Sequence, residues 1–301
     1  MNVTLLFRRL LPGALLAITL YAHGADNFNL ADTQAKAATG DPEAEFLLGR
    51  AYAHGQGVPI NMAKAAALFE QSANQGNAKA QNNLGALYLH GTGVKADPVI
   101  AMKWFQKSAD QGAALGEMNV GLCYLEGKGV AKDPKAGVDW LSKAADQNVV
   151  EAEIFLGDSY YLGSADIKQD YVTAKLWLTK AAQQGSASAQ TTLGVMYEHG
   201  TGLPQDSTKA FSLYQDAANQ GDAKGEASLG RAYLMGIGVA KDPIQAYKWL
   251  TIAKNQNEPI ASGLLRNFKE SLSPAQIAEG DKLVQEHESQ KSSSTTLHNI
   301  Q

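Results

Sequence analysis

Small and apolar residues recur every three or four positions in long blocks of the chain, and short glycine-containing segments separate these blocks. In one block, Ala80, Leu84 and Tyr88 share a helical face, because these spacings return a side chain to the same side of a helix. Gly85 lies in the same stripe, where glycine costs about 0.5 to 1 kcal/mol of stability relative to alanine. A glycine kept at that cost predicts that another helix packs too close to leave room for a Cβ atom.

This glycine belongs to a pattern that recurs six times along the chain. Successive glycines are separated by 36, 36, 36, 37 and 36 residues, and a tyrosine follows each of them three residues later. The glycines are Gly49, Gly85, Gly121, Gly157, Gly194 and Gly230, and the tyrosines are Tyr52, Tyr88, Tyr124, Tyr160, Tyr197 and Tyr233. A period of about 20 to 50 residues is typical of a repeat array, so we predict six tandem units over residues 41–257.

Each unit is predicted to contain two antiparallel helices joined by a glycine turn. The first helix ends at a Gly-x-Gly segment such as Gly91-Thr92-Gly93, which five of the six units keep. The second helix begins at a side chain that can accept a backbone N–H, namely Asn61, Asp97, Asp133, Asp170, Asp206 or Asp242. It ends at a residue that tolerates a left-handed backbone, namely Gly76, Gly112, Asn148, Gly185, Gly221 or Asn257.

Inside the second helix, a small residue is followed three positions later by a large one. The small residues are Ala65, Ala101, Gly137, Ala174, Ala210 and Ala246, and the large ones are Leu68, Trp104, Trp140, Trp177, Leu213 and Trp249. This alternation predicts ridges-into-grooves packing, with the large residues inserted between stacked helices.

The ends of the array are expected to be capped, because a terminal unit has a neighbour on one side only. Residues 25–40 are predicted to form an N-terminal capping helix with Asp32 and Thr33 on an exposed outer face. Residues 258–288 are predicted to form C-terminal capping helices, the second starting with a capping box at Ser273 and Gln276 and a hydrophobic staple between Leu272 and Ile277. Residues 289–301 are rich in Ser, Thr and Gln and are expected to be disordered.

The fourth unit differs from the others in its turn. The segment 163–170 is one residue longer than its equivalents and has Ala165 in place of the second glycine. Two interpretations stay open. The longer turn either reflects sequence drift in a solvent-exposed loop or is an insertion on the side of the solenoid that binds a partner.

Residues 1–24 have the layout of a secretory signal peptide. Arg8 and Arg9 precede an apolar run from Leu10 to Leu20, and small residues lead to an expected cleavage after Gly24. An apolar run of 11 residues is short of the roughly 20 that cross a bilayer, so we expect no stable membrane anchor after cleavage. General secretion is favoured over twin-arginine export, because Pro12 follows closely. The expected location is the periplasm, with secretion as the alternative.

Composition and charge exclude several classes of function. Hydrophobic residues make up 45% and charged residues 19% of the chain, which is typical of a folded protein. Removal of residues 1–24 would leave 24 basic and 30 acidic residues, and no cluster of Lys and Arg, so nucleic acid and anionic lipid are not expected as partners. Cys123 is the single cysteine and lies in a column of small and apolar residues, which predicts a buried thiol and excludes an internal disulfide.

The complete unit resembles the Sel1-like repeat family, a relative of the tetratricopeptide repeats. The second unit carries the motif as Ala80, Leu84, Gly85, Tyr88, Gly91, Gly93, Val94, Asp97, Ala101, Trp104, Ala109, Gln111 and Gly112. The resemblance covers residues 41–257, with departures at Asn148, Ala165, Lys254 and Asn257. It implies an all-α, right-handed α-solenoid superhelix of antiparallel helix pairs whose first helices line a concave surface. It also implies a scaffold or adaptor in protein complexes.

No catalytic, cofactor-binding or metal-binding residue is predicted. The Gly-x-Gly turns end a helix, whereas the glycines of nucleotide-binding loops follow a strand and open a helix. One repeat position at the end of the first helix is a histidine in three units, at His54, His90 and His199. A histidine there is stabilised by the negative end of the helix dipole, and the alternative is a shared metal site or a pH-sensitive contact. Some cysteine-rich proteins of the resembled family are associated with β-lactams, but their paired cysteines are missing here.

Candidate partner-binding residues are those that vary while the repeat frame stays constant. By helical geometry and by similarity to tetratricopeptide grooves, positions three before, one after and four after the repeat glycine should face the concave side. The candidates are Phe46, Arg50, Asn82, Leu89, Met118, Leu122, Leu125, Ile154, Asp158, Tyr161, Thr191, Glu198 and Arg231. An apolar centre flanked by Arg50 and Arg231 would resemble a protein interface, although the apolar members could equally pack on the neighbouring unit.

Two functional hypotheses follow. The leading one is an exported, monomeric scaffold that holds a protein or peptide in its concave groove, in the bacterial envelope or in host contact. The alternative is a protein that binds or hydrolyses β-lactams or peptidoglycan fragments, which rests on the family resemblance alone.

Overall fold

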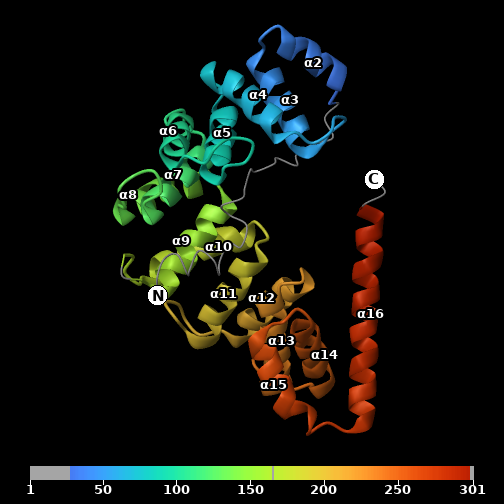
Figure 1. The fold of residues 1–301 in the computed structure, drawn as a ribbon. Helices are drawn as coiled ribbons and strands as arrows, with labels where there is room; N and C mark the ends of the chain where they lie inside the picture. Colours follow the sequence, from blue (N-terminus) through green and yellow to red (C-terminus); the bar gives the residue numbers. More distant parts are fainter. Residues whose placement is uncertain (1–27, 165, 299–301) are drawn as a thin grey trace. The chain divides into compact units, whose positions relative to one another are not determined.

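The computed structural model describes residues 28–164 and 166–298, with side chains described as far as residue 291. Within these residues all regular secondary structure is helical, and the chain divides into two compact units, Met1–Gln169 and Asp170–Gln301 (Figure 1). The first helices of the repeats are α3 (Pro42–His54), α5 (Ala78–His90), α7 (Ala114–Glu126), α9 (Val150–Leu162), α11 (Ala187–His199) and α13 (Ala223–Met235). The second helices are α4 (Met62–Asn74), α6 (Pro98–Ala109), α8 (Pro134–Asp146), α10 (Tyr171–Gln183), α12 (Ser207–Asn219) and α14 (Pro243–Asn255).

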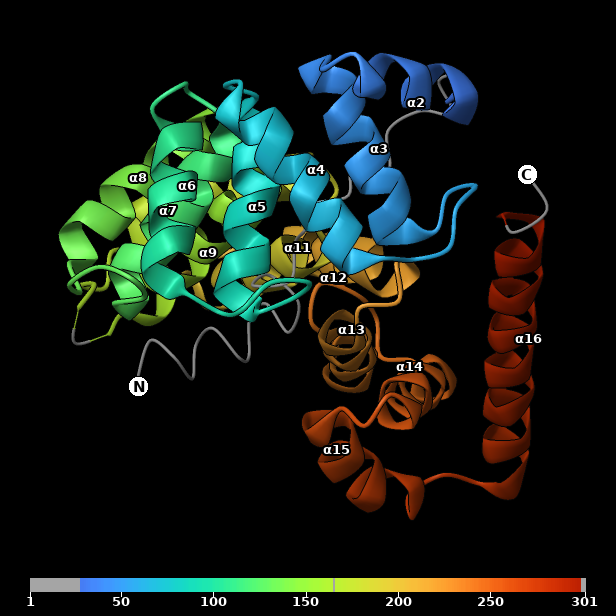
Figure 2. The same cartoon turned by 45° about the horizontal axis from the view of Figure 1, so that its top comes forward.

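Within each compact unit, consecutive helices pack against one another in the order of the chain. In the first unit, α3 packs on α4, α5 on α6 and α7 on α8, and each pair also contacts the pair that follows it. In the second unit, the pairs α11–α12 and α13–α14 are stacked in the same way (Figure 2). The two helices of the fourth repeat belong to different units, α9 to the first and α10 to the second. The predicted all-α solenoid of antiparallel helix pairs is confirmed.

The predicted start of each second helix is confirmed by hydrogen bonds. The Asp97 carboxylate accepts the backbone N–H groups of Val99 at 2.9 Å and Ile100 at 3.0 Å. The backbone N–H of Asp97 in turn donates to the carbonyl of Tyr88 at 2.8 Å. One residue therefore caps the second helix and also ties it to the last turn of the first. Asn61, Asp133, Asp206 and Asp242 repeat this double contact.

The predicted left-handed ends of the second helices are confirmed as well. Asn148 has φ 63° and Asn257 has φ 62°, and among the described residues they are the two non-glycine positions with positive φ. They stand where the other repeats have Gly76, Gly112, Gly185 and Gly221, all of which have positive φ. Asparagine tolerates this conformation better than other residues with a side chain, because its amide can bond locally.

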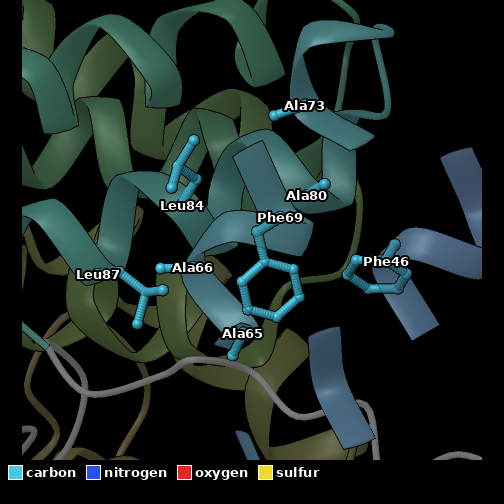
Figure 3. Packing of buried hydrophobic residues seen from close by; sticks show 8 residues of the cluster. All are labelled: Phe46, Ala65, Ala66, Phe69, Ala73, Ala80, Leu84 and Leu87. Carbon is cyan, nitrogen blue, oxygen red and sulfur yellow. The ribbon is translucent and has the colours of Figure 1, made fainter. Parts of the chain in front are cut away.

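The repeat glycine lies where the two helices of a pair approach most closely. A Cβ atom on Gly85 would lie 2.7 Å from the Phe105 ring and 3.1 Å from the Ala101 carbonyl oxygen. Corresponding contacts of 2.6 to 2.8 Å face Gly49, Gly121, Gly194 and Gly230, from Phe69, Leu141, Tyr214 and Leu250. Figure 3 shows Phe69 in the core of the first repeat. The expectation that a neighbouring helix excludes a Cβ atom is confirmed.

The large residue that fills this contact differs from the one expected. Phe69, Phe105, Leu141 and their equivalents are fully buried, whereas Trp104 and Trp140 in the preceding column stay partly exposed. The amino groups of Lys107 and Lys143 lie 4.1 and 3.7 Å from the centroids of these two indole rings. Trp104 and Trp140 therefore pack at the edge of the core, where a lysine three residues later covers each ring. Trp177 and Trp249 of the same column are buried.

The N-terminal capping helix is α2 (Leu30–Ala38), and it packs on α3. Asp32 is exposed as expected, but Thr33 is buried against the first repeat, because α2 lies on this repeat with the face that carries Thr33. The expected exposure on the outer face is therefore confirmed for Asp32 and wrong for Thr33. The expected signal peptide, residues 1–24, lies outside the described residues.

The C-terminal capping helices are α15 (Pro259–Lys269) and α16 (Pro274–His298). The capping box is confirmed, since the N–H of Ser273 donates to Gln276 Oε1 at 2.9 Å and the N–H of Gln276 donates to Ser273 Oγ at 3.3 Å. The expectation of disorder from residue 289 is wrong as far as residue 298, because α16 continues to His298. Residues 281–298 contain no glycine or proline, and each Ser or Thr weakens a helix by less than about 0.7 kcal/mol. Residues 299–301 lie outside the description.

Replacing Gly85 by alanine should destabilise the first compact unit. The added methyl group meets the Phe105 ring and a backbone carbonyl, an overpacking cost of about 1 to 3 kcal/mol that exceeds the gain in helix propensity of about 0.5 to 1 kcal/mol. Urea denaturation followed by circular dichroism measures the effect as a lower midpoint.

Gly263→Ala is the matched control for this prediction. Gly263 is also helical, in α15, but its Cβ position has no neighbouring atom within 4 Å. Its replacement should leave the midpoint unchanged or raise it. Equal midpoints for both variants would contradict the close contact at Gly85.

Candidate functional site

The column three residues before the repeat glycine was expected on the open concave face, but the structure buries it. Phe46, Asn82, Met118, Ile154 and Thr191 expose between 2% and 9% of their surface. The Phe46 ring lies against Phe69 with 5.9 Å between ring centroids (Figure 3). These side chains belong to the interior, so the column does not provide an accessible surface.

The polar members of this column connect one helix pair to the next. The Asn119 amide of α7 donates to Asn82 Oδ1 of α5 at 2.7 Å. The Thr191 hydroxyl of α11 donates to the Asp222 carboxylate, which caps α13, at 2.8 Å. A polar residue in this position thus satisfies a buried hydrogen bond between adjacent repeats.

The other two candidate columns are divided between the interior and the surface. Leu122, Leu125, Asp158 and Glu198 are buried. The half-exposed candidates are Arg50, Leu89, Tyr161 and Arg231. Arg50 lies over the Phe46 ring, with 5.8 Å between its guanidinium carbon and the ring centroid. Four of the thirteen candidates therefore offer accessible surface, and their role in partner binding stays a prediction.

Two candidates from successive repeats, Glu198 and Arg231, form a bidentate ion pair. The two guanidinium nitrogens of Arg231 lie 2.8 and 2.6 Å from the two carboxylate oxygens of Glu198. The Tyr214 hydroxyl, which is buried, donates to the same carboxylate at 2.7 Å. Burial opposes the charge on Glu198, but the hydrogen bonds from Arg231 and Tyr214 outweigh it and hold the pKa of this carboxyl below its ordinary value. Glu198 of α11 is thus joined to α12 through Tyr214 and to α13 through Arg231 within the second compact unit.

A ladder of buried polar residues was not anticipated from the sequence. A glutamate or a glutamine lies four residues before the repeat glycine. It accepts a hydrogen bond from the glutamine at the end of the second helix, which lies 30 residues later in the chain. Five such pairs, at 2.7 to 2.8 Å, are Gln75 with Glu45, Gln111 with Gln81, Gln147 with Glu117, Gln220 with Gln190 and Gln256 with Glu226. The constant spacing of 30 residues between these two polar positions was the signal available in the sequence.

Glu226 is the member of this ladder with the most altered acidity. It is fully buried between α13 and the end of α14, where it accepts a hydrogen bond from Gln256. Burial, reinforced by the nearby Asp222 carboxylate, raises the pKa of Glu226 to about 7, although Lys291 and Gln256 oppose the shift. Gln81 and Gln190 occupy the same position in other repeats, so a neutral amide satisfies the same contact.

The chemistry of the described residues can be compared with the expectations for metals, thiols and histidines. No set of three or more His, Cys, Asp or Glu side chains is placed to hold a metal ion within this part of the chain. The Cys123 thiol is buried as predicted, and burial raises its pKa to about 12, which disfavours the reactive thiolate. His54 is half-buried, and burial together with the neighbouring Arg50 lowers its pKa. None of the described helices is both long and apolar enough to cross a membrane.

The chain belongs to the Sel1 repeat family. The family model for the Sel1 repeat matches residues 42–77, 78–112, 114–149, 150–186, 187–222 and 223–258, which are the six helix pairs described above. Proteins of this family are generally scaffolds for protein–protein interaction and are typically non-catalytic. No curated protein matches the chain.

Solved structures with the same repeats resemble this chain. A Sel1 repeat protein from Oxalobacter formigenes is 30% identical with a TM-score of 0.68, and the match covers 85% of this chain and 75% of that one. The protein c5321, a protective antigen present in uropathogenic Escherichia coli strains, is 28% identical with a TM-score of 0.48 over 96% of this chain and 72% of that chain. A putative Sel1 repeat protein from Klebsiella pneumoniae is 21% identical with a TM-score of 0.46 over 67% of this chain and 98% of that chain.

Glu226→Gln should remove a pH dependence of stability. A carboxyl whose pKa is raised from 4.5 to about 7 by folding stabilises the native state below pH 4.5, and this contribution is lost as the pH rises through about 7. The variant should therefore match the wild type near pH 4 and be more stable near pH 8. Urea midpoints at the two pH values measure the difference, and Glu70→Gln reports the effect of replacing an exposed glutamate. A variant that is less stable at the higher pH would refute the assignment.

Arg231→Gln should destabilise the second compact unit, because it leaves the buried Glu198 carboxylate with Tyr214 but without its cation. We expect a loss of about 2 to 4 kcal/mol at neutral pH. The loss should fade as the pH falls from neutral through the lowered pKa of Glu198, because protonation removes the charge that needs a partner. Glu198→Gln added to Arg231→Gln should restore part of the stability. Thermal unfolding of both single variants and the double variant measures the coupling, and additive effects would contradict it.

Proposed function

We propose that this protein is an exported, monomeric scaffold that binds a protein or peptide partner on the exposed face of its first helices. Its setting would be the bacterial envelope or contact with a host. One observation carries the proposal: the frame of the repeats is constant, while the half-exposed positions beside it differ in chemistry, with Leu89 and Tyr161 four residues after the repeat glycine and Arg50 one residue after it. A rigid frame with variable surface positions is the arrangement that lets a repeat protein acquire a specific partner.

The frame supports binding because it needs little further ordering. Each first helix is held to its second helix at the repeat glycine and by the cap that bonds to the tyrosine carbonyl. Side chains carried on such helices lose little conformational freedom when a partner binds, which lowers the entropic cost of association. The half-exposed Leu89 and Arg50 supply an apolar and a cationic contact within the first compact unit.

Export is supported by the sequence of residues 1–24. The two arginines, the apolar run and the small residues before Ala25 have the order of a cleaved secretory signal. The single buried cysteine suits an oxidising compartment, because no exposed thiol is present among the described residues. We therefore propose the periplasm as the location, with secretion as the alternative.

Capture of partners from the exported fraction tests this proposal. A C-terminally tagged protein should be recovered from the periplasmic fraction with its N-terminus at Ala25, together with crosslinked partner proteins identified by mass spectrometry. The double variant Arg50→Glu, Leu89→Ser changes two half-exposed positions and should lose the partners retained by the wild type. Lys103→Glu, an exposed position on the second helix α6, is the matched control and should retain them.

Arg231 is unsuitable as a test position because it pairs with the buried Glu198. Circular dichroism of the double variant distinguishes a lost contact from a lost fold. Equal partner recovery by the double variant and the wild type would count against the first-helix face. Protein found only in the cytoplasm with residues 1–24 intact would count against export.

A further inference from the structure

A pocket of about 710 Å³ lies between α14 and α15, at the C-terminal end of the repeats. Its volume falls within the range of about 300 to 1,000 Å³ that is usual for ligand sites. One wall is a single face of α14, with Tyr247, Thr251 and Lys254 at helical spacings. The opposite wall is a face of α15 and the residue after it, formed by Ser262, Leu265, Arg266, Lys269 and Glu270.

The pocket is open because the last helix leaves the repeat pattern. In the preceding pairs the second helix packs on the first helix of its own pair. After α15, however, α16 packs on α14, and both views show α16 diverging from α15 beyond residue 273 (Figures 1 and 2). The α15 face that carries Ser262, Arg266 and Lys269 is therefore not covered in the way that earlier first helices are covered.

The walls of this α14–α15 pocket are positively charged although the whole chain is acidic. Lys254, Arg266 and Lys269 face one carboxylate, that of Glu270. Neither Lys254 nor Arg266 has an ion-pair partner among the described residues. Lys269 lies over the Tyr247 ring at 5.4 Å from its centroid, and Tyr247 donates its hydroxyl to Asp281 of α16 at 2.9 Å. Asp281 thus lies close to Tyr247 and Lys269, whereas no carboxylate of the described residues pairs with Lys254 or Arg266.

The same two walls also supply apolar surface and a hydrogen-bonding group. Leu265 and Tyr247 are buried and supply the apolar part. The Thr251 hydroxyl oxygen is buried and has no hydrogen-bond partner within the described residues. Thr251 lines the pocket, so its hydroxyl is a polar group on this wall that a ligand can engage. Lys254 and Arg266 lie on different walls, and apolar side chains also line the pocket. This arrangement suits a ligand that carries two separate carboxylates joined by an apolar residue.

We propose that the α14–α15 pocket binds an acidic peptide segment of a protein partner, at a site distinct from the first-helix face. From Tyr247 to Lys254 the wall rises about 10 Å, at 1.5 Å per residue, which matches about three residues of extended peptide. Two acidic side chains can then reach Arg266 and Lys254 while the residue between them contacts Leu265. Glu270 disfavours a compact dianion such as phosphate more than it disfavours two separated carboxylates.

Fluorescence anisotropy with the purified full chain and a labelled, end-blocked peptide Gly-Glu-Leu-Glu-Gly tests the proposal. The peptide Gly-Gln-Leu-Gln-Gly has the same shape without the charges. We expect the acidic peptide to bind, with weaker binding at about 0.5 M than at about 0.05 M NaCl because salt screens the contact. Arg266→Gln and Lys254→Gln should each weaken binding about fivefold. Lys224→Gln, an exposed lysine of α13 outside the pocket, should leave binding unchanged.

Several outcomes would overturn the proposal. Two concern the wild type: equal binding of the two peptides, or no binding at about 1 mM peptide. A third is unchanged affinity in both pocket variants. The fourth is displacement of the labelled peptide by inorganic phosphate at concentrations where acetate has no effect. Lys254 and Arg266 are exposed, so their replacement should not disturb folding. The assay uses purified components and keeps Arg50 and Leu89 intact, so its result is independent of whether the first-helix face captures a partner.

Discussion

The close approach of two helices at the repeat glycine is the constraint from which the rest of the architecture follows. With no side chain at Gly85, the Phe105 ring lies directly on the backbone of the first helix. This contact sets the separation of the helices and leaves one column of the second helix, from Phe69 to Leu250, to fill the core of each pair. The same separation allows the residue that caps the second helix to bond to the first helix. The backbone N–H of Asp97, for example, reaches the Tyr88 carbonyl because the two helices are already close.

The sequence predicts these local features well because each depends on few residues. A glycine period, a capping aspartate and an asparagine at a left-handed helix end act through their own backbone or one neighbour, so the pattern of residue types is sufficient. Asn148 shows this clearly, since an asparagine in place of glycine correctly indicated a positive φ. The helices, their order and the capping box at Ser273 were predictable for the same reason.

The accessible surface was not predictable in the same way, because it depends on how many neighbours each helix has. A helix with one packing partner keeps a polar face, and the period of its apolar residues indicates which face is exposed. The first helices of this array have partners on several sides, and residues 80–87 of α5 are buried without interruption. Asn82 and Glu198 therefore occupy positions that helical geometry assigned to the surface, yet both are buried and each makes a hydrogen bond to another repeat. Polarity at such a position indicates a contact between repeats as readily as it indicates a contact with a partner.

This distinction changes where recognition is to be sought on a stacked array. Inside the array, a buried polar group must be satisfied by the next repeat, so its chemistry is determined by the fold. The ladder from Glu45 to Glu226 follows this rule, since a glutamine near the end of the following second helix donates a hydrogen bond to Glu45, Gln81, Glu117, Gln190 and Glu226. After the sixth repeat, α16 packs on α14 and does not cover α15 as the second helices cover the first helices of the repeats. Unpaired cations such as Arg266 on α15 are tolerated there because solvent reaches them, and the same access makes them available to a ligand.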